Sequence, residues 1–180
     1  SGTTYTIEGE NISMKVSTSK GITAWKQGGI SVLPVGNETS ASPTYSNYRW
    51  IENDAPYGTD PYYETGNGIS SRTFTVKAND DNSAVTITEN ASGSRCNYKF
   101  VYTVNCDGTV DLDAQYTVTG SNLRRIGMLM QFNPELSMTR YYARGPMDNT
   151  IDRKQGSDLG IYDLPVSDFH VDYVRPQTSG

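Results

Sequence analysis

Strict alternation of apolar and polar residues on both sides of a short turn constrains the fold of this chain more than any other feature. Apolar side chains occupy every second position from Tyr98 to Val104, and again from Val110 to Val118. Between the two runs lies Asp107-Gly108, a dipeptide typical of a type I′ hairpin turn. A period of two predicts an antiparallel hairpin with one buried face. Asp111 and Asp113 fall on the opposite face, which we expect to be solvated.

Similar alternation predicts further short strands along the chain. The expected strands before the hairpin are Tyr5–Ile7, Ile12–Val16, Ile22–Trp25 and Ile30–Leu33, which would form a meander, followed by Phe74–Ala78 and Val85–Ile87. The run Ile126–Phe132 is more uniformly apolar, so we expect a strand buried on both faces. Met138–Ala143 is the last clear strand, and Ile161-Tyr162 and Val171–Val174 are candidates for short ones.

Composition supports an all-β fold without helices. Tyrosine, threonine and valine favour strands, and the chain contains 13 Tyr. The strong helix formers alanine and leucine are scarce. About ten short strands at this spacing are typical of an antiparallel β-sandwich. We therefore predict a single β-sandwich domain that spans residues 1–180.

Charge and hydropathy exclude two classes of partner. The net charge is −5, which leaves no basic surplus to neutralise nucleic-acid phosphates. No stretch approaches the roughly 18 apolar residues that a spanning helix needs. We expect neither a nucleic-acid nor a membrane partner. The chain opens with Ser-Gly-Thr-Thr rather than an apolar run, so we also expect no signal peptide.

The two cysteines lie at opposite ends of one predicted strand. Ten residues of extended chain span roughly 33 Å, whereas a disulfide needs Cα atoms within about 7 Å. We therefore expect Cys96 and Cys106 to be reduced and unpaired.

A long segment from Pro34 to Pro61 is rich in Gly, Pro and Asn but also carries aromatic residues. Within it, Glu52-Asn53-Asp54 is flanked by Trp50 and Tyr57, and Arg49 to Asp54 could form a short strand. Aromatic rings beside acids and amides are typical of a sugar-binding lip. The alternative interpretation is a loop held in place by its own aromatic residues.

A second polar cluster follows the last clear strand. It comprises Arg144, Asp148, Asn149, Asp152 and Arg153. We interpret it as a structural network of ion pairs and turns rather than as a catalytic centre. Arg144 is expected to be largely buried and bonded to carbonyls or to a carboxylate, with Asp148 or Asp152 as its leading partner.

The remaining acids and the single histidine predict no catalytic residue. Asp80 and Asp81 lie in a turn without the spaced ligand series of a calcium site. His170 lacks the context of a nucleophile elbow, and with the cysteines it lacks zinc-ligand spacing. We therefore predict no metal site and no cofactor within this chain.

The second polar cluster also carries a family resemblance. The run Tyr142-Ala143-Arg144-Gly145-Pro146-Met147-Asp148-Asn149, with Asp152-Arg153, resembles the Y-G-R-G-P-x-E-N-Y-x-D-R signature of glycoside hydrolase family 2 β-galactosidases. Tyr173-Val174-Arg175-Pro176-Gln177 resembles their Y-[VI]-R-P-Q stretch, and Leu123–Gly127 their R-[IV]-G strand. Trp50–Asp54 resembles the family's R-A-P-x-D-N-D stretch. Asp148, Thr150, Trp50 and Glu52 depart from the usual residues.

The resemblance implies the N-terminal part of the family's C-terminal small-chain domain (domain 5), a galactose-mutarotase-like supersandwich. The catalytic glutamates of that family lie in a separate barrel, so the resemblance implies a noncatalytic accessory domain. It would pack against the barrel and other domains and shape the active-site rim through Trp50, Glu52, Asn53 and Asp54. Sugars would bind weakly if at all. A free-standing carbohydrate-binding module is the alternative, and a mutarotase-like enzyme is disfavoured by the lone His170. The compartment, bacterial cytoplasm or periplasm, stays open, as do the natural galactoside and the oligomeric state.

Overall fold

The computed structural model describes residues 2–36, 43–47, 68–120, 123, 125–146, 149, 151 and 153–172. Within these residues the regular structure consists of antiparallel strands and short 3-10 helices, with no α-helix, so the all-β prediction is confirmed. The chain divides into two compact units, residues 1–48 with 64–133 and residues 49–63 with 134–180. That residues 1–180 form a single domain stays a prediction.

The first unit contains a four-stranded meander. Its strands are β1 (Thr4–Glu8), β2 (Ile12–Ser17), β3 (Gly21–Gln27) and β4 (Ile30–Ser31), hydrogen-bonded in that order. Alternate residues of β2, Ile12, Met14 and Val16, are buried, as the period of two predicts. The predicted meander is confirmed, although its last strand ends at Ser31 instead of Leu33.

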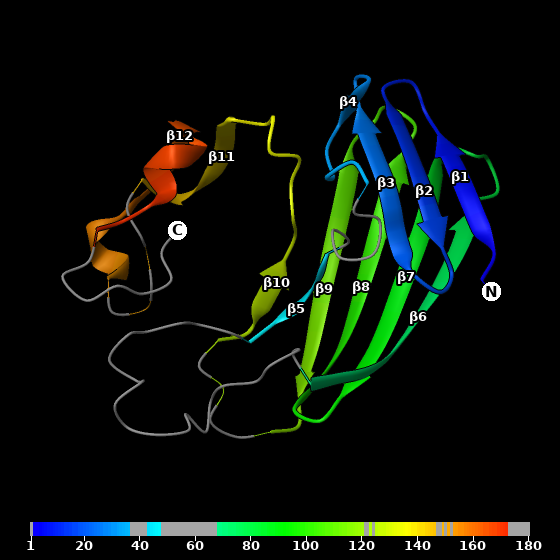
Figure 1. Cartoon of the computed structure of the whole chain (residues 1–180), viewed down its shortest axis with the longest axis horizontal. Coiled ribbons are helices and arrows are strands. Elements are labelled where there is room, and N and C mark those ends of the chain that lie inside the picture. Colours follow the sequence, from blue (N-terminus) through cyan, green and yellow to red (C-terminus); the bar gives the residue numbers. More distant parts are fainter. Residues whose placement is uncertain are drawn as a thin grey trace. The chain divides into compact units, whose positions relative to one another are not determined.

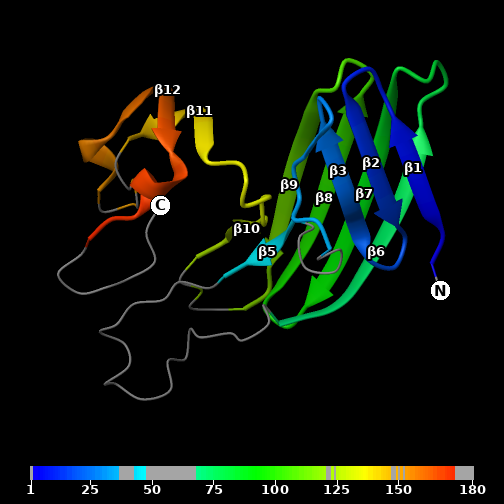
Figure 2. The same cartoon turned by 45° about the horizontal axis from the view of Figure 1, so that its top comes forward.

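A second four-stranded sheet completes a sandwich in the same unit. It is built from β6 (Ile69–Ala78), β7 (Ala84–Gly93), β8 (Cys96–Asn105) and β9 (Val110–Val118), again in sequence order. Figures 1 and 2 show that β1–β4 cover one face of this sheet. The predicted antiparallel sandwich is therefore confirmed in the first unit.

The β8–β9 hairpin pairs as expected, but its turn is of another type. Tyr98 lies opposite Tyr116 and Tyr102 opposite Leu112. The N–H of Gly108 donates to the carbonyl of Asn105, and the N–H of Asn105 donates to the carbonyl of Thr109. Gly108 has a positive φ of 88° but Asp107 does not, whereas a type I′ turn needs both. The connection is thus a longer turn with the left-handed glycine at its end, and the type I′ prediction is wrong.

The core between the two sheets is apolar and rich in aromatic rings. The ring centroids of Tyr98 and Phe100 are 4.4 Å apart, and Phe100 meets Tyr102 edge to face. Fourteen buried residues form one cluster: Ile7, Ile12, Met14, Val16, Ile22, Leu33, Tyr45, Ile87, Ala91, Cys96, Tyr98, Phe100, Tyr102 and Val104. Both sheets of the sandwich contribute residues to this cluster.

A small two-stranded sheet corrects two predictions. β10 (Gly127–Leu129) pairs antiparallel with β5 (Thr44–Ser46). The run Ile126–Phe132 is therefore not a strand buried on both faces, since β10 is only three residues long and Ile126, Leu129 and Phe132 are exposed. In the segment Pro34–Pro61 the strand expected was Arg49–Asp54, which lies outside the described residues. The segment also contains β5, which was not expected and whose Tyr45 is fully buried.

The second unit contains a two-stranded ribbon and two 3-10 helices. β11 (Met138–Gly145) pairs with β12 (Asp158–Pro165) over eight residue pairs. The helices η3 (Lys154–Gly156) and η4 (Val166–Phe169) flank β12. Met138–Ala143 is confirmed as a strand, but β12 is longer than the predicted Ile161-Tyr162. Val171 and Asp172 are not in a strand, and Tyr173 and Val174 lie outside the described residues.

Candidate functional site

A fully buried carboxylate lies in the core of the sandwich. Glu89 is on β7, where it follows Val85 and Ile87 on the inner face, and its exposed fraction is 0%. A buried charge is costly unless it is paired and hydrogen-bonded. We therefore ask which groups pair with the Glu89 carboxylate and hydrogen-bond to it.

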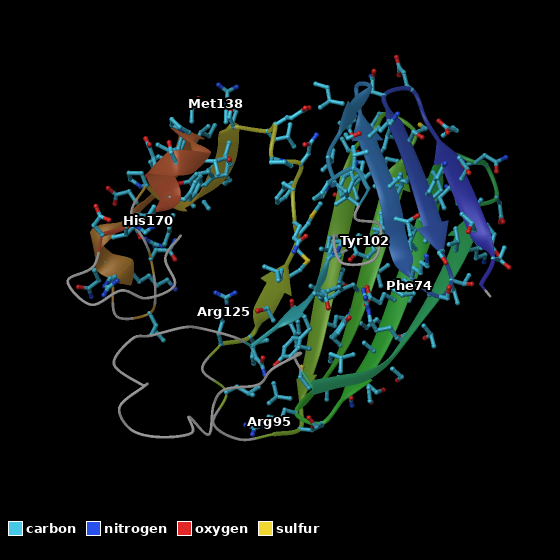
Figure 3. The ribbon with its side chains drawn as sticks, viewed as in Figure 1. Phe74, Arg95, Tyr102, Arg125, Met138 and His170 are labelled. Carbon is cyan, nitrogen blue, oxygen red and sulfur yellow. The ribbon has the colours of Figure 1, made fainter. Side chains whose placement is uncertain are left out.

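Two neighbouring strands supply the partners of Glu89. Oε1 accepts hydrogen bonds from Arg72 Nε on β6 at 2.6 Å and from the Tyr98 hydroxyl on β8 at 2.5 Å. Arg72 lies diagonally across from Glu89, which is opposite Phe74 on one side and Phe100 on the other. The guanidinium also lies 5.1 Å from the Phe74 ring centre, within cation–π distance. Tyr102 and Phe74 are labelled in Figure 3.

Arg72 connects this cluster to a further segment of chain. Its Nη2 donates to the carbonyl of Pro43 at 3.2 Å, immediately before β5. On β5, Tyr45 stacks on Tyr98 with a centroid distance of 6.1 Å. The Arg72–Glu89–Tyr98 cluster thus ties β6, β7 and β8 to the start of β5 through side-chain contacts.

Electrostatics in the cluster favour a paired cation and neutral phenols. Burial alone would lower the pKa of Arg72, but the hydrogen bond and charge of Glu89 outweigh it and raise that pKa. Burial, followed by the hydrogen bond and charge of Glu89, raises the pKa of Tyr98. Burial and the charge of Glu89 also raise the pKa of Tyr102. Both hydroxyls therefore keep their protons, and that of Tyr98 acts as a donor to the carboxylate.

Two atoms near the cluster are buried without a hydrogen-bond partner in the described part of the chain. They are Oε2 of Glu89 and the hydroxyl oxygen of Tyr102. Both residues project to the inner face, and Tyr102 is opposite Ile87, two residues before Glu89. An unsatisfied buried polar atom costs about 1–3 kcal/mol. The cluster therefore contains one acceptor and one donor that its own residues leave unmatched.

The chemistry open to this cluster is limited by its burial and by its single acid. Retaining glycoside hydrolysis needs two carboxyl groups about 5–5.5 Å apart across the substrate bond. Glu89 has a guanidinium and phenols around it instead, and its side chain is closed to solvent. The geometry fits a structural anchor between strands rather than an acid–base pair.

Six of the nine predicted site residues are outside what the structure describes. Trp50, Glu52, Asn53, Asp54, Asp148 and Asp152 all fall there. The proposed rim and the acidic partners of Arg144 stay predictions.

Of the described members of the second polar cluster, Arg144 and Asn149 are exposed and Arg153 is partly buried. Arg144 is exposed, so the expectation of a largely buried guanidinium is wrong. Its Nη1 donates to the carbonyl of Ser157 at 2.9 Å, in line with the expected carbonyl partner. Asn149 donates to the carbonyl of Arg144 at 2.9 Å, and the carbonyl of Arg153 accepts from Gly156. These contacts hold the chain between the end of β11 and the start of β12.

The other residues considered for chemistry make local contacts. His170 Nε2 lies 3.1 Å from Asp172 Oδ1, with both side chains exposed, and Ser167 donates to Asp168. In the turn before β7, the backbone N–H of Ser83 lowers the pKa of Asp81. Across residues 2–36, 43–47, 68–120 and the other described positions, no three His, Cys, Asp or Glu residues could hold a metal ion. The same residues contain no helix long and apolar enough to cross a membrane.

The fold and its buried polar cluster define an all-β sandwich protein with a structural anchor in its core. Comparison with protein families gives this class a more specific identity. The family described as the beta galactosidase small chain matches residues 8–180, and the chain belongs to this family. The resemblance found in the sequence is thereby confirmed.

Two curated relatives share part of the chain. A beta-galactosidase of Priestia megaterium is 32% identical over 81 residues, which are 44% of this chain and 8% of that protein. A beta-galactosidase of Pectobacterium atrosepticum is 29% identical over 72 residues, 40% of this chain and 7% of that protein. The chain thus matches less than a tenth of the length of either relative.

Proposed function

We propose that this chain is a noncatalytic accessory domain of a β-galactosidase, an enzyme that hydrolyses terminal β-D-galactosides. The observation that carries the proposal is the family match over residues 8–180. The partial identity to two beta-galactosidases supports it. In this proposal the domain packs against the catalytic barrel and the other domains of the parent enzyme.

The buried cluster supports a role in shaping the active-site rim. β5 ends at Ser46, and the rim candidates Trp50, Glu52, Asn53 and Asp54 follow it in sequence. Arg72 holds the carbonyl of Pro43, and Tyr98 packs on Tyr45, so the start of β5 is fixed to the sandwich core. We propose that this anchoring fixes the strand from which the chain continues to the rim residues, and that those residues shape the active-site rim of the parent enzyme.

The test uses the full-length polypeptide that the gene encodes, assayed with nitrophenyl β-D-galactoside. Hydrolysis is expected, and Trp50→Ala should raise KM several-fold with a smaller effect on kcat, because a rim residue contributes binding more than bond breaking. Tyr5→Ala is the matched control, since Tyr5 is a half-exposed aromatic residue on β1. A full-length protein without galactosidase activity would contradict the accessory-domain proposal. Equal kinetics of both variants would contradict the rim role.

A further inference from the structure

The β8–β9 turn contains the one Asp-Gly dipeptide of the sequence, Asp107-Gly108. Aspartate isomerises most readily before glycine, because glycine has no side chain to hinder an approach to its backbone nitrogen. In this reaction the nitrogen attacks Cγ of the protonated aspartyl side chain, the N–Cγ bond forms, and the Cγ–OH bond breaks. The hydroxyl leaves with the amide proton as water, and a succinimide ring remains.

Water then opens this ring. When water adds to the carbonyl carbon of the former main chain, the bond from that carbon to the glycine nitrogen breaks. The chain now runs through Cγ, which gives an isoaspartate with one additional main-chain carbon. No oxidant or cofactor is consumed, so Asp107, Gly108 and water are a complete set of reactants.

In the folded turn the side chain of Asp107 is engaged by the residue that follows Gly108. Oδ1 of Asp107 accepts hydrogen bonds from the backbone N–H of Thr109 at 2.9 Å and from its hydroxyl at 2.7 Å. These bonds, the backbone one first, lower the pKa of Asp107, so the carboxyl stays ionised at neutral pH. An ionised carboxylate cannot release an oxygen as water without first gaining a proton. The turn thus keeps the carboxyl in its unreactive form, although the residue is exposed.

The attacking nitrogen is held as well. The N–H of Gly108 donates to the carbonyl of Asn105 at 3.0 Å, and the carbonyl of Gly108 accepts from Gln27 Nε2 at 3.0 Å. Asn105 in turn holds Thr109, since its N–H donates to the Thr109 carbonyl and its Nδ2 to the Thr109 hydroxyl. Ring closure requires the Gly108 nitrogen to give up its hydrogen bond and turn toward Cγ. The native geometry therefore opposes the reaction at both reacting atoms.

We propose that Asp107-Gly108 is a site of spontaneous isoaspartate formation, which the folded β8–β9 turn holds closed through Thr109. Isomerisation then proceeds from molecules in which the turn has opened. In the product, the additional main-chain carbon moves Thr109 away from Asn105. The inference goes beyond the proposed function and does not depend on it, because the site lies in a hairpin of the sandwich and its chemistry involves no galactoside.

The test uses the full-length polypeptide that the gene encodes, incubated for weeks at neutral pH either in buffer or in guanidinium chloride. Trypsin cuts after Lys99 and Arg124, so one peptide carries Asp107 together with Asp111 and Asp113. Electron-transfer fragmentation in a mass spectrometer identifies which of the three has become isoaspartate. Asp107 should isomerise at least about tenfold faster in guanidinium chloride than in buffer, because the native turn must open first.

The two other aspartates of that peptide are internal controls. Asp111 precedes leucine and Asp113 precedes alanine, so both should change little in either sample. Equal rates at Asp107 in buffer and in guanidinium chloride would overturn the proposal. So would isomerisation in guanidinium chloride that is no faster at Asp107 than at the two controls.

Two substitutions of Thr109 test its part in closing the site. Thr109→Val removes the hydroxyl at nearly constant volume and should raise the rate at Asp107 in buffer several-fold, while the rate in guanidinium chloride stays the same. Thr109→Ser keeps a hydroxyl and is the matched control, with the rate of the unsubstituted protein. The gain in Thr109→Val should exceed the increase in the unfolded fraction that a denaturation curve measures for it. A gain no larger than that increase, or equal rates in the two variants, would overturn the role of Thr109.

Discussion

Two ion pairs of the same length lie in different surroundings in this protein. Arg72–Glu89 and Arg140–Asp163 each join an arginine Nε to a carboxylate oxygen at 2.6 Å. The carboxylate of Glu89 is fully buried, whereas that of Asp163 is 53% exposed. Because water screens exposed charges but not buried ones, equal distances should correspond to unequal contributions to stability.

Removing the cation of the buried pair should destabilise the sandwich strongly. Arg72→Met keeps an unbranched apolar side chain but leaves the Glu89 carboxylate uncompensated. We expect it to lower the free energy of unfolding by about 3–5 kcal/mol, measured by urea denaturation. Arg140→Met is the matched control and should cause no measurable change. Adding Glu89→Gln to Arg72→Met should restore part of the loss, because it removes the uncompensated charge, and a double variant less stable than Arg72→Met would contradict this account.

Tyrosine burial predicts a loss of stability at alkaline pH. An unfolded phenol has a pKa of about 10, and burial raises the pKa of Tyr98 and Tyr102 in the folded state. Above pH 10 the folded protein therefore holds protons that the unfolded chain has lost. Stability should be fully present below that pH and fall above it, by about 1.4 kcal/mol per pH unit for each phenol.

Tyr102→Phe separates the two tyrosines. Its hydroxyl has no partner among the described residues, so the substitution should be neutral or stabilising at pH 7. Above pH 10 the decline of the unfolding free energy should become shallower by the contribution of one proton. Urea denaturation at several pH values from 7 to 11 measures both effects. An unchanged slope would show that Tyr102 does not titrate on unfolding.

The buried cluster was partly readable from sequence. Alternation in β7 places Val85, Ile87 and Glu89 on one face, so a charged residue at an inward position was the available signal. Its partner could not be inferred, because Arg72 meets Glu89 through the register of β6 and β7, which includes a shift near Ile69. Arg144, in contrast, was chosen from a dense polar motif, which does not determine burial.

At the scale of single elements, the two cysteines at the ends of β8 should differ in reactivity. Cys96 is buried at its start, and Cys106 is exposed just after its end. Burial also raises the pKa of the Cys96 thiol, and the thiolate is the reactive form. Cys106 should react promptly with a thiol reagent in the native protein, and Cys96 only on unfolding. Fewer than two reactive thiols in denaturant without prior reduction would contradict the free state of the cysteines.

Glycine substitutions in the β8–β9 turn and in η3 should have opposite effects on stability. Gly108 has a φ of 88°, and an added Cβ would lie 2.9 Å from Gln27 Nε2. Gly108→Ala should cost about 1 kcal/mol or more, while Gly156→Ala, with open space around it and an ordinary φ, should be neutral or stabilising. Urea denaturation of both variants gives the comparison. Equal stabilities would show that the turn tolerates an ordinary residue at position 108.

Alternation predicted the elements well where one face is buried, as in β2 and β8, and also in β9, whose Val110, Leu112 and Tyr116 are partly buried against the core. It failed where pairing is decided by distant chain. The apolar run Ile126–Phe132 pairs only through β10 with β5, more than 80 residues earlier in the sequence. β12 extends beyond the expected Ile161-Tyr162 because its pairing with β11 includes Asp158 and Gly160, residue types that are depleted in strands.

At the scale of the whole molecule, the match over residues 8–180 establishes the family. The proposed part is that catalysis takes place in a separate barrel of the parent enzyme. Among the described residues, the one carboxylate sealed in the core faces a guanidinium and phenols. Such an arrangement provides no second carboxyl group for hydrolysis. The account therefore depends on the chain being inactive by itself.

The most direct measurement is nitrophenol release from nitrophenyl β-D-galactoside by the purified 180-residue chain, compared with buffer. The account predicts no turnover above the buffer rate. Turnover that disappears in Glu52→Gln or Asp54→Asn would contradict it and place those carboxylates in an active site within this chain.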